Sequence, residues 1–167
     1  MFKEIWYSPF TVAFFKAAKS MKTARDLLIG QDLTVISKTR TVYDAAKIMA
    51  ERKIGALPVL EGERVVGIFS ERDVMNRVVA KDQNPQKTTV EQVMTKELII
   101  GEPDENIEQI LIRMKQANIR HLPIIEQGKL IGIISFRDLL QADLKEKDEE
   151  IKIMTAYIHY IPPTFES

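Results

Sequence analysis

Two short polar motifs of the form Ser-x-Arg-Asp, at residues 70–73 and 135–138, are the parts of this chain best suited to chemistry. An aspartate at this spacing can accept hydrogen bonds from the two hydroxyls of a ribose, while the serine and a helix N-terminus can donate to oxygen-rich groups. The same spacing is close to a capping box, in which serine and aspartate only begin a helix. Both interpretations can hold at once, because a helix start has free N–H groups that a polar ligand can use.

A further candidate is the pair Arg120-His121, which stands directly before Leu122-Pro123. An arginine at the start of a strand can hold a phosphate through two parallel hydrogen bonds. A lone histidine is more often a structural residue, so His121 by itself predicts no function. Before the other Leu-Pro pair the chain has Gly55-Ala56, which offer only backbone groups and space.

The chain lacks the parts of the common catalytic sites. It has no cysteine and two histidines, and it contains none of the patterns HExxH, GxxxxGK[ST] or GxSxG. Neither triad chemistry nor metal-assisted hydrolysis is therefore expected. We predict a protein that is not an enzyme and that holds no metal.

Charge and hydropathy argue against two kinds of partner. Twenty-four basic and 24 acidic residues cancel, and no segment concentrates lysine or arginine, so nucleic acid is not an expected partner. The apolar stretch at residues 10–18 is interrupted by Lys16 and is much shorter than the roughly 20 residues of a membrane span, so neither a membrane anchor nor a signal peptide is expected. The lack of cysteine suits a reducing compartment, and a cytoplasmic location is expected.

The two Ser-x-Arg-Asp motifs close two copies of an internal repeat with a period of 65 residues. Residues 53–73 read KIGALPVLEGERVVGIFSERD, and residues 118–138 read NIRHLPIIEQGKLIGIISFRD. Repeated units bury each other's faces, so functional groups are expected between the copies. Near the start of the copies the separation is 66 residues, and the first copy therefore carries one extra residue around positions 29–32.

After a short capped turn, which begins at Thr23 or Thr89, each copy predicts a strand, a helix, a hairpin and a second helix. These are expected at residues 33–36, 42–49, 57–69 and 74–79 in the first copy and at 98–100, 107–114, 122–134 and 139–144 in the second. Capping boxes at 41–44 and 106–109 begin the longer helices. Pro58 and Pro123 must lie where the sheet needs no N–H group, at a strand start or on an edge.

Two flanking segments lie outside the repeat. In the first, Ser8-Pro9 indicates a helix start, and an apolar stripe follows at helical spacing: Phe10, Phe14, Ala17 and Met21. We expect this stripe to pack on the protein's own body or on a second subunit rather than on a membrane or a ligand. In the second, the charged run KEKDEE leads into a further stripe that predicts a helical tail: Ile151, Met154 and Ile158. We expect this stripe, together with the helical faces that the two copies leave uncovered, to form the interface of a two-fold dimer.

The two copies resemble CBS domains, and the tandem pair resembles a Bateman module. Four features carry the resemblance and occur in the same order in both copies: the capped helix, the apolar-Leu-Pro-apolar strand, the apolar-Gly-Ile-apolar strand and the Ser-x-Arg-Asp ending. The resemblance implies an α/β (α+β) fold of two β-α-β-β-α units related by a pseudo-two-fold axis, with flanking N- and C-terminal helices. The expected division is an extension at 1–20, unit 1 at 21–80, a linker at 81–88, unit 2 at 89–144 and a tail at 145–167.

The resemblance also implies a function. CBS pairs are regulatory modules that bind adenosine-containing ligands such as AMP, ADP, ATP, NAD(H) or S-adenosylmethionine, and that modulate a partner such as an enzyme or a transporter. They commonly form homodimers. The alternative is a module that uses the same fold to dimerise and binds no ligand. The complete Ser-x-Arg-Asp motif in both copies favours binding.

Two clefts are implied, each with the motif of one copy facing the residues before the proline of the other. The first would contain Ser70, Asp73, Arg120, His121 and Arg137, and the second would contain Ser135, Asp138, Gly55, Ala56 and Arg72. The first is richer in cations, and His121 can gain charge as the pH falls towards about 6.5, so we expect the first cleft to hold a phosphorylated ligand more tightly. If Arg120 is instead paired with an acid such as Glu126, the two clefts should be similar.

Overall fold

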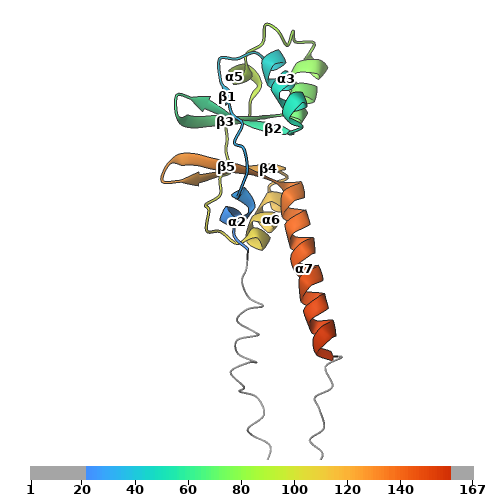
Figure 1. Ribbon diagram of the computed structural model, residues 1–167. Helices are drawn as coiled ribbons and strands as arrows, with labels where there is room; N and C mark the ends of the chain where they lie inside the picture. The colour runs from blue at the N-terminus through green and yellow to red at the C-terminus, as the bar shows by residue number, and fades with distance from the viewer. Residues whose placement is uncertain (1–21, 159–167) are drawn as a thin grey trace, which may run out of the picture.

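The computed structural model describes residues 22–158, and the predicted N-terminal helix at 1–20 lies outside the described residues. Two mixed units are stacked with their sheets facing each other, and they meet through strands β3 (Arg64–Ser70) and β5 (Lys129–Ser135) (Figure 1). The predicted α+β fold of two related units is confirmed. None of the helices within residues 22–158 combines the length and the apolar character that a membrane span requires.

The elements of the two units follow the repeat. Unit 1 contains β1 (Ile36–Ser37), α3 (Val42–Arg52), β2 (Ala56–Glu61), β3 and the consecutive helical segments α4 (Glu71–Asp73), η1 (Val74–Val78) and η2 (Val79–Lys81). Unit 2 contains α6 (Ile107–Gln116), β4 (His121–Glu126), β5 and α7 (Phe136–Ile158). Two short helices, α2 (Ala24–Leu28) and α5 (Val90–Val93), open the two sequence copies.

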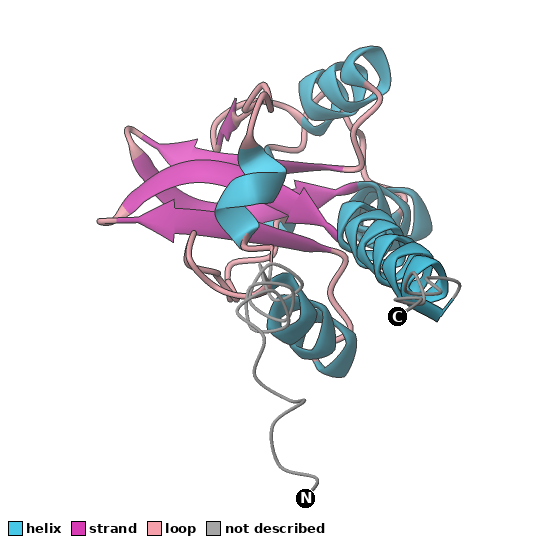
Figure 2. Cartoon of the chain, turned by 60° about the horizontal axis from the view of Figure 1, so that its bottom comes forward, coloured by secondary structure: helices cyan, strands magenta, loops and turns pink. Residues whose placement is uncertain are grey.

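Each sheet is built on an antiparallel hairpin, β2–β3 or β4–β5, and β1 adds to β2 in parallel. In Figure 2 the hairpins of the two units lie in adjacent layers with helices around them. Pro58 lies opposite Ile68 in the β2–β3 pair, and the N–H of Ile68 donates instead to the carbonyl of Thr95 at 2.9 Å. The sheet needs no N–H group at Pro58, because Pro58 faces a residue whose hydrogen bonds point the other way. Pro58 is nevertheless the third residue of β2, which lies between β1 and β3, so the expected position at a strand start or on an edge is wrong for this proline.

The short helix that opens each copy packs in the core of the other unit. Ala24 of α2 is fully buried with Ile107, Leu122 and other core residues of unit 2. Val90 and Val93 of α5 are buried with Leu57 and Phe69 of unit 1. This exchange ties the units together, because neither core is complete without a segment from the other sequence copy.

The first strand of each copy differs from the prediction. Strand β1 is shorter and later than 33–36, and the predicted strand at 98–100 is wrong, since unit 2 has a single bridge there, between Gly101 and Ile124. In unit 1 the N–H of Lys38 donates to the carbonyl of Leu60 and continues the pairing. The corresponding residue of the second copy is Pro103, which has no N–H to donate, so the pairing stops.

The helices also differ in detail. The capping box at Thr41–Asp44 is confirmed, but the one predicted at Asn106–Gln109 is wrong, because the short Asn106 side chain accepts only from the N–H of Glu108, at 2.7 Å. The closing helix of the first copy continues as a π-helix and a 3-10 turn rather than as one α-helix. The tail is not a separate helix, since α7 runs without a break from the second motif through the charged run.

Candidate functional site

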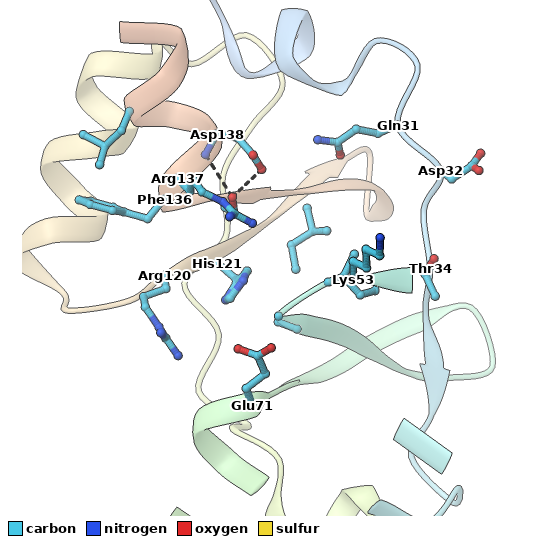
Figure 3. A pocket seen from close by; sticks show the side chains of 16 residues that line it. Gln31, Asp32, Thr34, Lys53, Glu71, Arg120, His121, Phe136, Arg137 and Asp138 are labelled. Atoms are coloured by element: carbon cyan, nitrogen blue, oxygen red, sulfur yellow. Dashed lines mark hydrogen bonds between the residues drawn. The ribbon is translucent and has the colours of Figure 1, made fainter. Parts of the chain in front are cut away.

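A cavity of about 760 Å³ lies between the two units and receives residues from both. Unit 1 contributes the loop before β1, the end of α3, the start of β2 and the start of α4, while unit 2 contributes the starts of β4 and α7 and the end of β5 (Figure 3). Its polar lining residues are Gln31, Asp32, Thr34, Lys53, Glu71, Arg120, His121, Ser135, Arg137 and Asp138. This volume falls within the range of small-molecule sites.

Asp138 lies in the first turn of α7 and faces this cavity (Figure 3). Its Oδ2 accepts from the hydroxyl of Ser135 at 2.5 Å, and its N–H donates to the same hydroxyl oxygen at 3.2 Å. Among the residues that the structure describes, Oδ1 of Asp138 has no hydrogen-bond partner. Part of the capping geometry is therefore present, and one carboxylate oxygen stays available to a ligand.

Asp73, the corresponding residue of the first copy, is engaged within the protein. Its Oδ2 accepts from the N–H of Ser70 at 2.9 Å and from the Ser70 hydroxyl at 2.8 Å, which completes a capping box. Its Oδ1 lies 3.4 Å from Nη1 of Arg77 and 3.5 Å from the hydroxyl of Thr95. The capping interpretation thus describes the first motif well, and both oxygens of Asp73 already have partners.

A smaller cavity of about 250 Å³ adjoins Asp73. Ser70, Arg72, Asp73, Arg77 and Thr95 line it, together with Arg120 and His121, which reach both cavities. The structure places Arg137 in the larger cavity and Arg72 in the smaller one, the opposite of the expected assignment. Gly55 and Ala56 line the larger cavity with Ser135 and Asp138, as expected.

Cations at the larger cavity come from both units. Lys53 ends α3 with a left-handed backbone, φ 55°, and Arg120 and Arg137 flank β4 and α7. Within the described part of the chain, no carboxylate oxygen lies within 4 Å of a side-chain nitrogen of these three cations. In the same part of the chain, the lining acids Asp32 and Glu71 form no salt bridge. The alternative of an Arg120–Glu126 salt bridge is wrong, because Glu126 pairs with Arg25 at 2.7 Å.

His121 lies at the centre of the site and stays neutral at physiological pH. Burial is the largest of the causes that lower its pKa to about 4; the charges of Arg120 and Arg72 act in the same direction, and Asp138 opposes them. The expectation that His121 gains charge near pH 6.5 is therefore wrong. A Cβ on Gly55 would lie 3.2 Å from Nε2 of His121, so the absence of a side chain at Gly55 is what leaves room for the imidazole.

The cavities differ in size because the two copies differ by one residue. In unit 1, Ile68 of β3 exchanges two backbone hydrogen bonds of 2.9 Å with Thr95, which lies two residues after the end of α5. Seven residues join Leu28 to Ile36, whereas six join the corresponding Met94 to Gly101. With the extra residue, the loop after α2 turns away at Gly30, φ 78°, and among the described residues Ile133 of β5 makes no such exchange. The edge of β5 is consequently left open to the larger cavity.

Several lining residues were not predicted from the sequence: Gln31, Asp32, Thr34, Lys53 and Glu71. Gln31 and Asp32 lie where the first copy carries its extra residue, and Thr34 follows two positions later, so this departure from the repeat was the available indication. Lys53 and Glu71 occur only in the first copy, where the second has Asn118 and Phe136. These differences between the copies did not predict a site, because only the folded structure shows that residues 53, 71 and 120 line one cavity.

Comparison with known proteins gives a consistent result. The family model for the CBS domain matches residues 24–80 and 90–145. The CBS domain-containing protein YhcV of Bacillus subtilis (strain 168) is 36% identical over 119 residues, 71% of this chain and 84% of that protein. Curated relatives from Arabidopsis thaliana are longer, and the chain spans 60% or less of them.

Solved structures show the same fold. A putative signal-transduction protein with CBS domains from Burkholderia ambifaria MC40-6 shares 35% identity, with a TM-score of 0.71 over 74% of this chain and 95% of the other. The CBS domain pair of protein MJ0100, solved in complex with 5′-methylthioadenosine and S-adenosyl-L-methionine, has a TM-score of 0.67 over 75% of this chain and 98% of the other. At 23% identity, that second likeness concerns the fold alone.

Proposed function

The chain belongs to the CBS-domain family, and from that premise we propose that it is a regulatory module whose larger cavity binds an adenosine-containing ligand. Tandem CBS pairs are regulatory modules. The observation that supports the proposal most is the difference between the two motif carboxylates, since Asp73 is fully engaged and Asp138 keeps one oxygen without a partner in the described chain. A free carboxylate oxygen beside a cavity of about 760 Å³ can accept a ribose hydroxyl.

The remaining groups fit the other parts of such a ligand. In this proposal Lys53 and Arg120 bind a phosphate or carboxylate, because a charge-assisted hydrogen bond is stronger than a neutral one. The backbone of Gly55 and Ala56 and the neutral His121 border the cavity beside them. Ser135 orients Asp138, and Arg137 adds a further cation.

The smaller cavity is a weaker site in this proposal. Its Ser70, Arg72 and Asp73 have the matching residue types, but a ligand that bonded to Asp73 would have to displace Arg77 or Thr95. This reverses the order of affinity expected from the sequence, because the cleft expected to bind more tightly is the smaller one. One tight binding event per chain is therefore expected.

The complex of MJ0100 with two adenosine compounds supports the ligand class. The choice among AMP, ADP, ATP, NAD(H) and S-adenosylmethionine is one for experiment. The cavity lining has three acids, Asp32, Glu71 and Asp138, and three cations, Lys53, Arg120 and Arg137, so its formal charges balance and favour neither an anionic nor a cationic ligand outright.

A thermal melt against these five compounds and 5′-methylthioadenosine tests the proposal. A ligand present at 100 times its Kd should add about 2.7 kcal/mol to the free energy of unfolding, which for a chain of this size raises the melting temperature by roughly 5–10 °C. Guanosine monophosphate serves as the control, since it has the same ribose and phosphate. If no adenosine compound shifts the melt, the proposal is wrong.

We also propose that the module forms a homodimer through the helices on its outer face, and that this dimer acts on a partner protein such as an enzyme or a transporter. Large apolar side chains are exposed on helical segments of both units: Tyr43, Met75, Val79 and Ile112. Exposed apolar side chains that gather on helices are typical of interfaces. A dimeric mass by light scattering without any ligand response would instead favour the alternative of a dimerisation module that binds no ligand.

A further inference from the structure

The apolar stripe of α7 beyond the body of unit 2 has no cover within the described chain. Leu144, Ile151 and Met154 are 65%, 62% and 63% exposed. Figure 1 shows α7 extending away from the units. Large apolar side chains in such a row usually contact another surface.

Residues 1–21 join the described chain beside the base of this extension. The carbonyl of Lys22 accepts from the N–H of Ile107 at 3.1 Å, at the start of α6. Glu108, the next residue of α6, accepts from Nζ of Lys147 at 3.4 Å. Lys22 and Lys147 therefore contact two consecutive residues of α6, Ile107 and Glu108, and lie close to each other. A helix that leads back from Lys22 along α7 would run antiparallel to it.

The two segments have matching spacings in that direction. Read backwards, the N-terminal stripe is spaced four, three and four residues apart, as Met21, Ala17, Phe14 and Phe10. Read forwards, α7 has apolar residues at the last two of these steps, three and four residues apart, as Ile151, Met154 and Ile158, and the position before them is the cation Lys147. Alternating steps of three and four residues are the spacing of paired helices, and each set of four positions would span roughly 16 Å.

Charge favours this partner over a second copy of α7. Along residues 143–155 of α7 five acids outnumber three lysines, two of which pair with Asp143 and Asp148, so this segment is net negative and two copies of it side by side would repel each other. Residues 8–21 contain Lys16 and Lys19 and no acid. Opposite charges along the edges of paired helices favour association.

We propose that residues 8–21 pack as an amphipathic helix, antiparallel, on the apolar stripe of α7, with Ala17 opposite Ile151 and Phe14 opposite Met154. The pairing is independent of the ligand. It gives the aromatic stripe of the N-terminal segment a surface on the same chain.

Disulfide formation in the full chain tests the register, since the chain has no cysteine of its own. The pair Ala17→Cys with Ile151→Cys should form an intramolecular disulfide at least about tenfold faster than Ala17→Cys with Glu149→Cys, because position 149 lies on the opposite side of α7. Equal rates in the two variants would overturn the proposal. So would a disulfide that links two chains, which would assign the stripe to a second copy.

Trypsin cleavage after Lys16 and Lys19 provides a second measurement that needs no new thiol. Met154→Asp should speed this cleavage about tenfold, and Glu149→Gln should leave it unchanged. If Met154→Asp has no effect, the proposal is wrong. If the double-cysteine chain binds phosphatidylglycerol vesicles through residues 8–21 and forms no intramolecular disulfide, the stripe belongs to a membrane surface, and the proposal is equally overturned.

Discussion

Replacing each motif aspartate by asparagine should separate folding from ligand binding. Asp73 is 8% exposed and accepts from the N–H and the hydroxyl of Ser70 at 2.9 and 2.8 Å. Asparagine can keep the cap, since it is about as good as aspartate at helix starts, but it loses the charge. Hydrogen bonds to a charged acceptor contribute about 1.5–3 kcal/mol and neutral ones about 1 kcal/mol.

The expected loss of stability for Asp73→Asn is therefore about 1–4 kcal/mol, from two hydrogen bonds that become neutral. The ion pair with Arg77 adds less than about 1 kcal/mol, because the Arg77 side chain is 45% exposed and water screens it. At about 2–4 °C per kcal/mol the melting temperature should fall by several degrees. Affinity for the adenosine ligand should stay within about twofold, since Asp73 does not line the larger cavity.

Asp138→Asn should give the opposite result. The Ser135 hydroxyl can still donate to the amide oxygen, so stability should change by less than about 1 kcal/mol. Loss of a charged acceptor for ribose hydroxyls should weaken binding by about tenfold or more. Melting curves and calorimetric titration of both variants supply the two measurements. If both variants lose stability equally and neither loses affinity, capping explains both aspartates and the assignment of the ribose site is wrong.

Other substitutions test single contacts. Arg120→Ala should weaken AMP binding about tenfold and leave adenosine binding nearly unchanged. Arg72→Ala is the matched control, because Arg72 lines only the smaller cavity. An equal loss of affinity for AMP and for adenosine would refute a phosphate contact. Burial is the main reason that the pKa of His121 is about 4 in the native state, below the 6.5 of the unfolded chain. Between these pH values the unfolded state binds a proton and the native state does not. The free energy of unfolding should therefore fall by up to about 3 kcal/mol as the pH is lowered from 6.5 to 4. His121→Gln should remove that share of the pH dependence in urea denaturation, and an unchanged slope would contradict the neutral histidine. Gly67→Ala should cost about 1–3 kcal/mol, since its Cβ would lie 2.9 Å from the carbonyl oxygen of Thr95, whereas Gly132→Ala meets only the flexible Leu28 side chain and should cost less.

Periodicity was sufficient to predict most of the fold. The i, i+3, i+4, i+7 pattern located α3 and α6, and the glycine turns located both hairpins. The exchange of α2 and α5 between the units could not be predicted. Both helices are short and apolar and the two cores are similar, so the sequence does not indicate which helix packs in which core. Pro103 explains why no first strand forms in unit 2, since it has no N–H to donate to β4. The sequence alone could not show this, because it does not reveal that position 103 is the one that has to donate.

The site was harder to predict, because the difference expected between the clefts, Arg120-His121 against Gly55-Ala56, is not the difference that the structure shows: Arg120 and His121 line both cavities. Ser-x-Arg-Asp occurs intact in both copies, yet only in the second does the carboxylate keep an oxygen without a partner in the described chain, since Arg77 and Thr95 occupy the first. Neither residue has its counterpart at the second motif: the second copy has Ala142 in place of Arg77, and the loop with the extra residue stays away from β5. A single inserted residue between Leu28 and Ile36 thus leaves one sheet edge open and brings Gln31 and Asp32 to the cavity. Comparing the two copies with each other, position by position, is therefore more informative about the binding site than comparing either copy with the general motif.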